Sequence, residues 1–105
     1  MNGNISPLIT VGITAFNEGD LLQEAWDSVK NQTSSHFKTI MMLDGGATIE
    51  TAYIFNNINS PNLLKFKEKD NRGPYWCRSK VIEKCETEWY FHLDGDDRLP
   101  LDIIE

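Results

Sequence analysis

Apolar residues recur along this chain in two alternating patterns, short continuous runs and stripes with helical spacing. Continuous runs of strand length occupy residues 8–16, 37–43, 63–66 and 89–93, and the first two are typical of strands covered on both faces. Helical patterns lie between them, at residues 21–29, 48–58 and 74–86. Strands that alternate with helices predict an α/β fold with a mostly parallel, Rossmann-like sheet.

The chain is expected to form a single domain over residues 1–105. It contains no internal repeat, linker or low-complexity tract, and 105 residues suffice for one hydrophobic core. Residues 99–105 have the pattern of a helix that begins and is cut short. We therefore expect a fragment of a longer protein.

Composition and charge exclude several classes of protein. Ten basic residues against sixteen acidic ones give a net charge of −6, which disfavours binding to nucleic-acid phosphates. No apolar run reaches the ~18 to 20 residues that span a bilayer, and the first residues lack the pattern of a secretory signal, so we expect a cytoplasmic protein without a transmembrane segment. Cys77 and Cys85 lie two helical turns apart, too far for a disulfide, and are expected to be thiols.

Polar residues cluster where three of the predicted strands end: residues 14–18, 44–46 and 94–97. Because ligands of open parallel sheets bind beyond the carboxyl ends of the strands, we expect these groups to converge. The last group holds three carboxylates, Asp94, Asp96 and Asp97, which repel one another unless solvent or a cation offsets their charge. They predict a metal site, and a solvated turn that caps a following helix is an equal alternative. Strand alternation favours packing of His92 against a helix over metal ligation.

Five segments, in order and with fitting spacing, resemble the N-terminal half of a family 2 glycosyltransferase of GT-A fold. They are residues 8–18, Gln32-Thr33, residues 43–46, Asn71-Arg72-Gly73 with Arg78-Ser79, and residues 91–97. The resemblance implies a sheet truncated before the acceptor-binding half of that fold. It also implies a nucleotide-sugar site, in which Asp44 contacts the pyrimidine ring, Arg78 supports the base or diphosphate, and the turn around base and ribose comprises Thr14, Ala15, Phe16, Asn17 and Glu18.

The same resemblance assigns Asp94-Gly95-Asp96 to the DxD element of the family. Such an element contacts the ribose and a divalent cation, Mn²⁺ or Mg²⁺, that bridges the two phosphates. Asp96 is the expected direct ligand, with Asp94 and Asp97 as further metal-binding candidates. Hard carboxylate oxygens suit these ions, and a bound cation stabilises the charge that develops on a leaving diphosphate.

The implied reaction of the full-length enzyme is metal-assisted transfer of a sugar from a nucleoside diphosphate sugar, with a UDP-sugar favoured. The acceptor is a hydroxyl group of a sugar, lipid or protein, and the enzyme lies in the cytoplasm or at the inner face of a membrane. The general base lies beyond Glu105 in this family, so the catalytic residue is unknown and this chain alone is expected to be inactive. Surfaces meant for the missing half are expected to promote self-association.

Two other functions are compatible with these residues. One is a non-catalytic nucleotide-binding module. The other is a nucleotidyltransferase of similar fold, although residues 14–18 lack the glycine-rich, basic character of a triphosphate loop. The chain also departs from the family pattern, with one acid rather than two after the second strand and Ser79 where asparagine is common. Arg98 is expected to pair with Asp97 or to face a phosphate, and Tyr75 and Trp76 are weaker candidates for the pocket lining.

Overall fold

The computed structural model describes residues 9–32 and 36–99, in which strands and helices alternate as the sequence predicts. The elements in chain order are β1 (Ile9–Ala15), α1 (Asp20–Lys30), β2 (Phe37–Leu43), α2 (Ile49–Asn57), β3 (Leu63–Lys67), α3 (Pro74–Glu83) and β4 (Trp89–Asp94).

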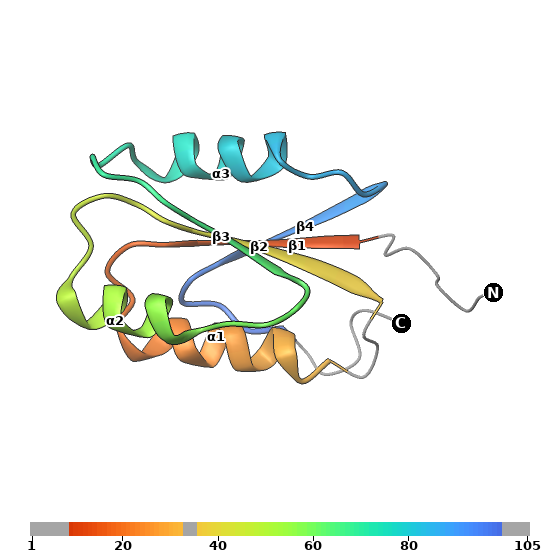
Figure 1. Ribbon diagram of the computed structural model, residues 1–105, viewed down its shortest axis with the longest axis horizontal. Helices are drawn as coiled ribbons and strands as arrows, with labels where there is room; N and C mark the ends of the chain where they lie inside the picture. The colour runs from red at the N-terminus through yellow and green to blue at the C-terminus, as the bar shows by residue number, and fades with distance from the viewer. Residues whose placement is uncertain (1–8, 33–35, 100–105) are drawn as a thin grey trace.

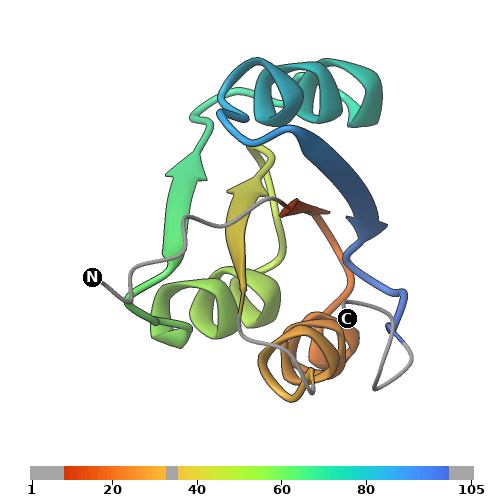
Figure 2. The ribbon, with the colours of Figure 1, turned by 90° about the vertical axis from the view of Figure 1, so that its right-hand side faces the viewer.

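The four strands form one parallel sheet in the order β3-β2-β1-β4. Helices α1 and α2 cover one face and α3 covers the other, as Figures 1 and 2 show. The chain moves outward from β1 to β2 and β3, and α3 then returns it to the far side of β1, where β4 pairs. The direction of strand order therefore reverses between β1 and β4. The predicted parallel α/β fold is confirmed.

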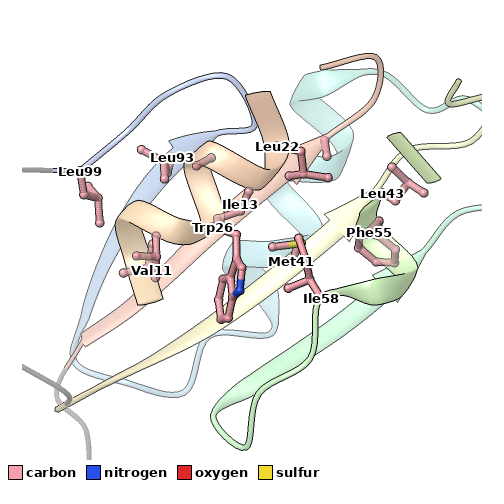
Figure 3. Packing of buried hydrophobic residues seen from close by; sticks show 13 residues of the cluster. Val11, Ile13, Leu22, Trp26, Met41, Leu43, Phe55, Ile58, Leu93 and Leu99 are labelled. Carbon is pink, nitrogen blue, oxygen red and sulfur yellow. The ribbon is translucent and has the colours of Figure 1, made fainter. Parts of the chain in front are cut away.

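The larger hydrophobic cluster lies between the sheet and the pair α1 and α2 (Figure 3). Side chains from one face of β1, β2 and β4 meet those of both helices there, and Trp26 on α1 belongs to this cluster as the helical stripe predicts. The buried members are Val11, Ile13, Ala15, Leu22, Ala25, Trp26, Val29, Met41, Leu43, Phe55, Ile58, Leu93 and Leu99. This face provides most of the apolar burial that stabilises the domain.

The cluster under α3 is smaller. Its buried members are Ile40, Met42, Cys77 and Val81, with Phe66, Trp76 and Tyr90 packed against them. Both cysteines are free thiols, as expected, and Cys77 is buried whereas Cys85 is half-buried. At the sheet edge, Trp89 and Phe91 of β4 are 64% and 41% exposed.

Several element boundaries differ from the sequence prediction by one to three residues, among them those of β3, α3 and β4. Strand β3 includes Lys67, because this residue pairs with Leu43 and Glu68 N–H donates to the Leu43 carbonyl at 2.9 Å. Helix α3 ends at Glu83 rather than at residue 86, and β4 includes Asp94, which pairs with Thr14. The expected helix at 99–105 falls outside the described residues beyond Leu99.

Within the described ranges, no helix combines the length and the apolar content that crossing a bilayer requires.

Candidate functional site

A pocket of about 440 Å³ opens at the carboxyl ends of the strands. These strand ends lie at the left of Figure 1. It lies where the strand order reverses, the place at which open parallel sheets bind their ligands. Its volume is within the usual range of small-molecule sites. The lining comes from all three groups of polar residues that the sequence places at strand ends, and from the start of α3: Thr14, Ala15, Phe16, Glu18, Asp44, Asn71, Gly73, Pro74, Cys77, Asp94 and Asp96.

The turn after β1 forms one wall of this pocket. Phe16 N–H donates to a carboxylate oxygen of Glu18, Oε1, which closes the turn on itself. Asn17 does not line the pocket: it is exposed, and its side-chain oxygen accepts a hydrogen bond from Thr48 N–H at the start of α2. The structure thus brings four of the five predicted residues of this turn to the pocket and uses Asn17 to link the turn to a helix.

Asp44 is buried at the end of β2, only 6% exposed, and its carboxylate accepts four hydrogen bonds. Oδ1 accepts from the backbone N–H groups of Gly45 and Arg72, both at 2.8 Å. Oδ2 accepts from Gly73 N–H at 3.0 Å and from the Asn71 side-chain amide at 3.4 Å. Because a carboxylate offers about four lone-pair positions, these bonds nearly saturate it and tie residues 71–73 to the sheet.

Cys77 and Asn71 are pocket residues to which the sequence analysis gave no role. Asn71 donates to the Gly45 carbonyl at 3.1 Å as well as to Asp44. The pKa of the Cys77 thiol is raised to about 12, first by burial and then by the negative charge and hydrogen bond of Asp44. The thiol therefore stays protonated. In the sequence, Asn71 was indicated only by the Asn71-Arg72-Gly73 segment of the family resemblance, and nothing indicated Cys77 as a pocket residue.

The acidic turn after β4 lies against the β1 turn and supplies a further part of the lining. Asp94 and Asp96 line the pocket, and Asp97 does not. Asp97 N–H donates to the Asp94 carbonyl at 2.9 Å, which closes the turn. Gly95 is buried and its N–H donates to the Thr14 carbonyl at 2.9 Å; a Cβ there would stand 3.0 Å from both that carbonyl oxygen and the Glu18 carboxylate. A larger residue at this position would push β4 and the β1 turn slightly apart.

Among the described residues, no three side chains of His, Cys, Asp and Glu gather as the ligands of one metal ion. The alternative in which the acids cap a following helix concerns residues beyond 99, outside the described part of the chain.

The cationic and aromatic candidates lie beside the pocket rather than in its lining. Arg78 is exposed on α3, although its charge acts on Tyr90 and His92 of β4. Arg98 pairs with Glu24 of α1 at 3.5 Å, not with Asp97. Tyr75 is 86% exposed. The remaining candidate, Trp76, packs against the smaller cluster. The positively charged groups of Arg72 and Lys80 lie over its ring.

Comparison with known proteins decides the family. The sequence model described as glycosyl transferase family 2 matches residues 10–105. The chain belongs to this family. It is 31% identical over 93 residues to the SPbeta prophage-derived glycosyltransferase SunS of Bacillus subtilis, an alignment that covers 88% of this chain and 21% of SunS.

Two solved glycosyltransferases share the fold of this family 2 domain. TarS of S. aureus (residues 1–349, in complex with UDP) superposes with a TM-score of 0.79 at 22% identity, over 90% of this chain and 29% of that one. The mannosyltransferase PcManGT of Pyrobaculum calidifontis, in complex with GDP-Man and Mn²⁺, superposes with a TM-score of 0.77 at 20% identity, over 91% of this chain and 29% of that one. The fold is therefore that of the GT-A glycosyltransferases, and this chain spans less than a third of each of these proteins.

Proposed function

We propose that this domain binds a nucleoside diphosphate sugar together with Mn²⁺ or Mg²⁺, as the donor half of an enzyme that transfers the sugar to a hydroxyl group. The observation that carries the proposal is the pocket at the strand-order reversal, which Asp94 at the end of β4 and Asp96 in the following turn line together with the β1 turn and Asp44. Family membership supports it, and so do the ligands of the two solved structures, UDP in one and GDP-Man with Mn²⁺ in the other.

The acids of the pocket fit a cation that is bound jointly with the donor. Mg²⁺ is usually held by one or two carboxylates plus substrate phosphates rather than by an all-protein cage. Asp94 and Asp96 provide two carboxylates at the pocket. A bound cation would neutralise the charge that grows on the leaving diphosphate. Asp96 is our candidate for the direct ligand.

The remaining residues shape and hold the donor site. Thr14, Ala15 and Phe16 form the wall that we assign to base and ribose, and Glu18 fixes the turn that presents them. Asp44 holds the loop at the base side through its bonds to residues 72 and 73. The preference for UDP rests on the family resemblance and on the TarS structure that holds UDP. Arg78 adds positive potential on the β4 side. The acceptor hydroxyl and the general base that deprotonates it are assigned to parts of the enzyme outside these residues.

Calorimetric titration of UDP, GDP, dTDP and CDP, each with and without Mn²⁺, tests this function. We expect one nucleotide, UDP, to bind in a Mn²⁺-dependent manner and Asp96→Asn to lose that binding. Asp27→Asn is the matched control, because it removes the same charge from α1, away from the pocket. A folded protein that binds none of the four nucleotides under any condition would refute the proposal.

A further inference from the structure

Three alternate residues of β4, Tyr90, His92 and Asp94, form a continuous chain of hydrogen-bonding groups. Alternate residues of a strand project from the same face, here the face that α3 covers, where Tyr90 packs on the smaller cluster. The Tyr90 hydroxyl lies 2.8 Å from His92 Nδ1, and His92 Nε2 lies 3.1 Å from Asp94 Oδ1 and 3.3 Å from Thr14 Oγ1. The last member of this chain lines the pocket.

Asp94, at one end of this chain of groups, fixes which atoms donate and which accept. The ionised carboxylate of Asp94 can only accept, so the proton must lie on His92 Nε2. The imidazole is held on both sides: its side chain is 6% exposed, Nδ1 lies 2.8 Å from the Tyr90 hydroxyl, and Nε2 lies 3.1 Å from Asp94 Oδ1. A neutral imidazole with its proton on Nε2 has a bare Nδ1, which accepts from the Tyr90 hydroxyl.

Gly12 on β1 makes this arrangement possible. A Cβ at that position would overlap the Tyr90 hydroxyl and a methyl group of Val81. The absence of a side chain at Gly12 lets Tyr90 lie against the strand with its hydroxyl directed along β4 toward His92. Burial also raises the pKa of Tyr90, which keeps the hydroxyl protonated as a donor.

We propose that Tyr90 and His92 are positioning residues that hold the Asp94 carboxylate in place for the donor and its cation. His92 Nε2–H fixes one carboxylate oxygen, and the other is left for the ligand. Partners in this outer position tune the affinity of acidic ligands for a metal and fix their orientation. The inference rests on the proposed function for the identity of the ligand, whereas the hydrogen-bonded chain itself can be tested without one.

The first experiment is ¹⁵N-detected NMR of the histidine side chains in the ligand-free protein at neutral pH. We expect a proton on His92 Nε2, as the contact with Asp94 requires, and we expect Tyr90→Phe to shift the Nδ1 resonance. His36→Gln assigns the two histidines, because His36 precedes β2 at the opposite end of the sheet. An imidazole whose only proton lies on Nδ1 would overturn the proposal, because Nε2 would then have no hydrogen to donate to Asp94.

The second experiment measures the affinity for Mn²⁺ with UDP in three variants. His92→Phe keeps a ring but removes the donor, and we expect the affinity to fall by about tenfold, the lower limit for loss of such a partner. His92→Gln retains an N–H near the position of Nε2 and should recover most of the loss, and Tyr90→Phe should fall between the two. Circular dichroism and thermal unfolding of each variant report whether the fold is intact.

The outcomes separate this inference from the proposed function. If His92→Phe binds as tightly as the parent, or if His92→Gln is as weak as His92→Phe in an intact fold, the positioning role is wrong. If the parent protein binds no nucleotide but His92 carries its proton on Nε2, the tautomer supports the orienting chain, and the missing binding overturns only the proposed function.

Discussion

The two acidic turns at the pocket differ in what their carboxylates contact. Asp44, after β2, is 6% exposed and accepts hydrogen bonds from three backbone N–H groups and one side-chain amide. Asp94, after β4, has a side chain that is 64% exposed and is contacted by one imidazole among the described residues. The turn at 94–97 is otherwise closed by its own backbone.

Asp44 therefore has a structural role, whereas the acids of the turn at 94–97 are free to bind a ligand. A buried carboxylate with four donors stabilises the loop that it holds, and its removal leaves several donors without a partner. Exposed carboxylates at a turn contribute little to stability, so they can be replaced at small cost to the fold. Two groups of the same chemistry, at the same edge of one sheet, thus serve different ends.

Asp44→Ala should have the largest effect on stability. Loss of the carboxylate leaves the N–H groups of Gly45, Arg72 and Gly73 without their acceptor, and we expect a cost of about 3 kcal/mol in the free energy of unfolding. Urea denaturation measures it. Asp44→Asn, which keeps the shape and one acceptor oxygen, should fall between this variant and the parent. A change in Asp44→Ala no larger than that of a surface substitution would mean that the loop does not depend on this carboxylate.

Asp96→Asn should show the opposite behaviour. We expect the free energy of unfolding to change by less than about 0.5 kcal/mol, because Asp96 is an exposed residue of a turn. The Mn²⁺-dependent affinity for UDP should nevertheless fall by about tenfold or more, as a ligand of the cation is lost. Calorimetry and urea denaturation on the same sample give both values. If Asp96→Asn lowered the free energy of unfolding as well as the affinity, Asp96 would have a structural role like that of Asp44, and the two turns would not differ.

The Asp44 side of the pocket should also lose stability in alkali. The pKa of Cys77 is raised to about 12 in the folded protein from an ordinary value of 9.0, so the unfolded chain releases its proton first. The stabilising contribution of the protonated Cys77 thiol to the free energy of unfolding is fully present below pH 9.0. It declines as the pH rises towards about 12.

Cys77→Ala tests that pH dependence. The difference in the free energy of unfolding between parent and variant should shrink between neutral and strongly alkaline pH. Cys85→Ala is the control, because the pKa of Cys85 is lowered: hydrogen bonds from Thr87 and Thr10 outweigh the effect of its burial. Its contribution has the opposite sign and should grow with pH. If the free energy of unfolding changed with pH in the same way in both variants, the opposite pKa shifts of Cys77 and Cys85 would be wrong.

Asp97→Asn should have the smallest effect. Asp97 lies in the same turn as Asp96 but outside the pocket lining. Its substitution removes only a screened charge near the ligand, and we expect the affinity for Mn²⁺ and UDP to stay within about threefold of the parent value. An effect as large as that of Asp96→Asn would make Asp97 a ligand and restore the three-acid site that the sequence suggests.

The alternation of apolar runs and stripes was sufficient to predict the α/β class and the parallel sheet, because burial on both faces leaves continuous apolar strands. It also predicted that the turns after β1, β2 and β4 converge. The saturation of Asp44 could not be predicted, since its donors come from a loop distant in the chain and are mostly backbone groups that carry no sequence signal. The alternation of residues along β4 predicted that His92 lies on the face covered by a helix. Its hydrogen bond to Tyr90 could not be predicted, because it depends on the absence of a side chain at Gly12, which only the folded structure shows.

The loop between β3 and α3 is attached at its base by Asp44, mainly through main-chain N–H groups that every non-proline residue carries. The attachment is therefore largely indifferent to the side chains at positions 70 and 72, which are exposed. A library that varies these two positions while Asp44, Asn71 and Gly73 are kept would change the loop beside the pocket without rebuilding the sheet. If the proposed function holds, this loop is the place at which to redesign nucleotide selectivity.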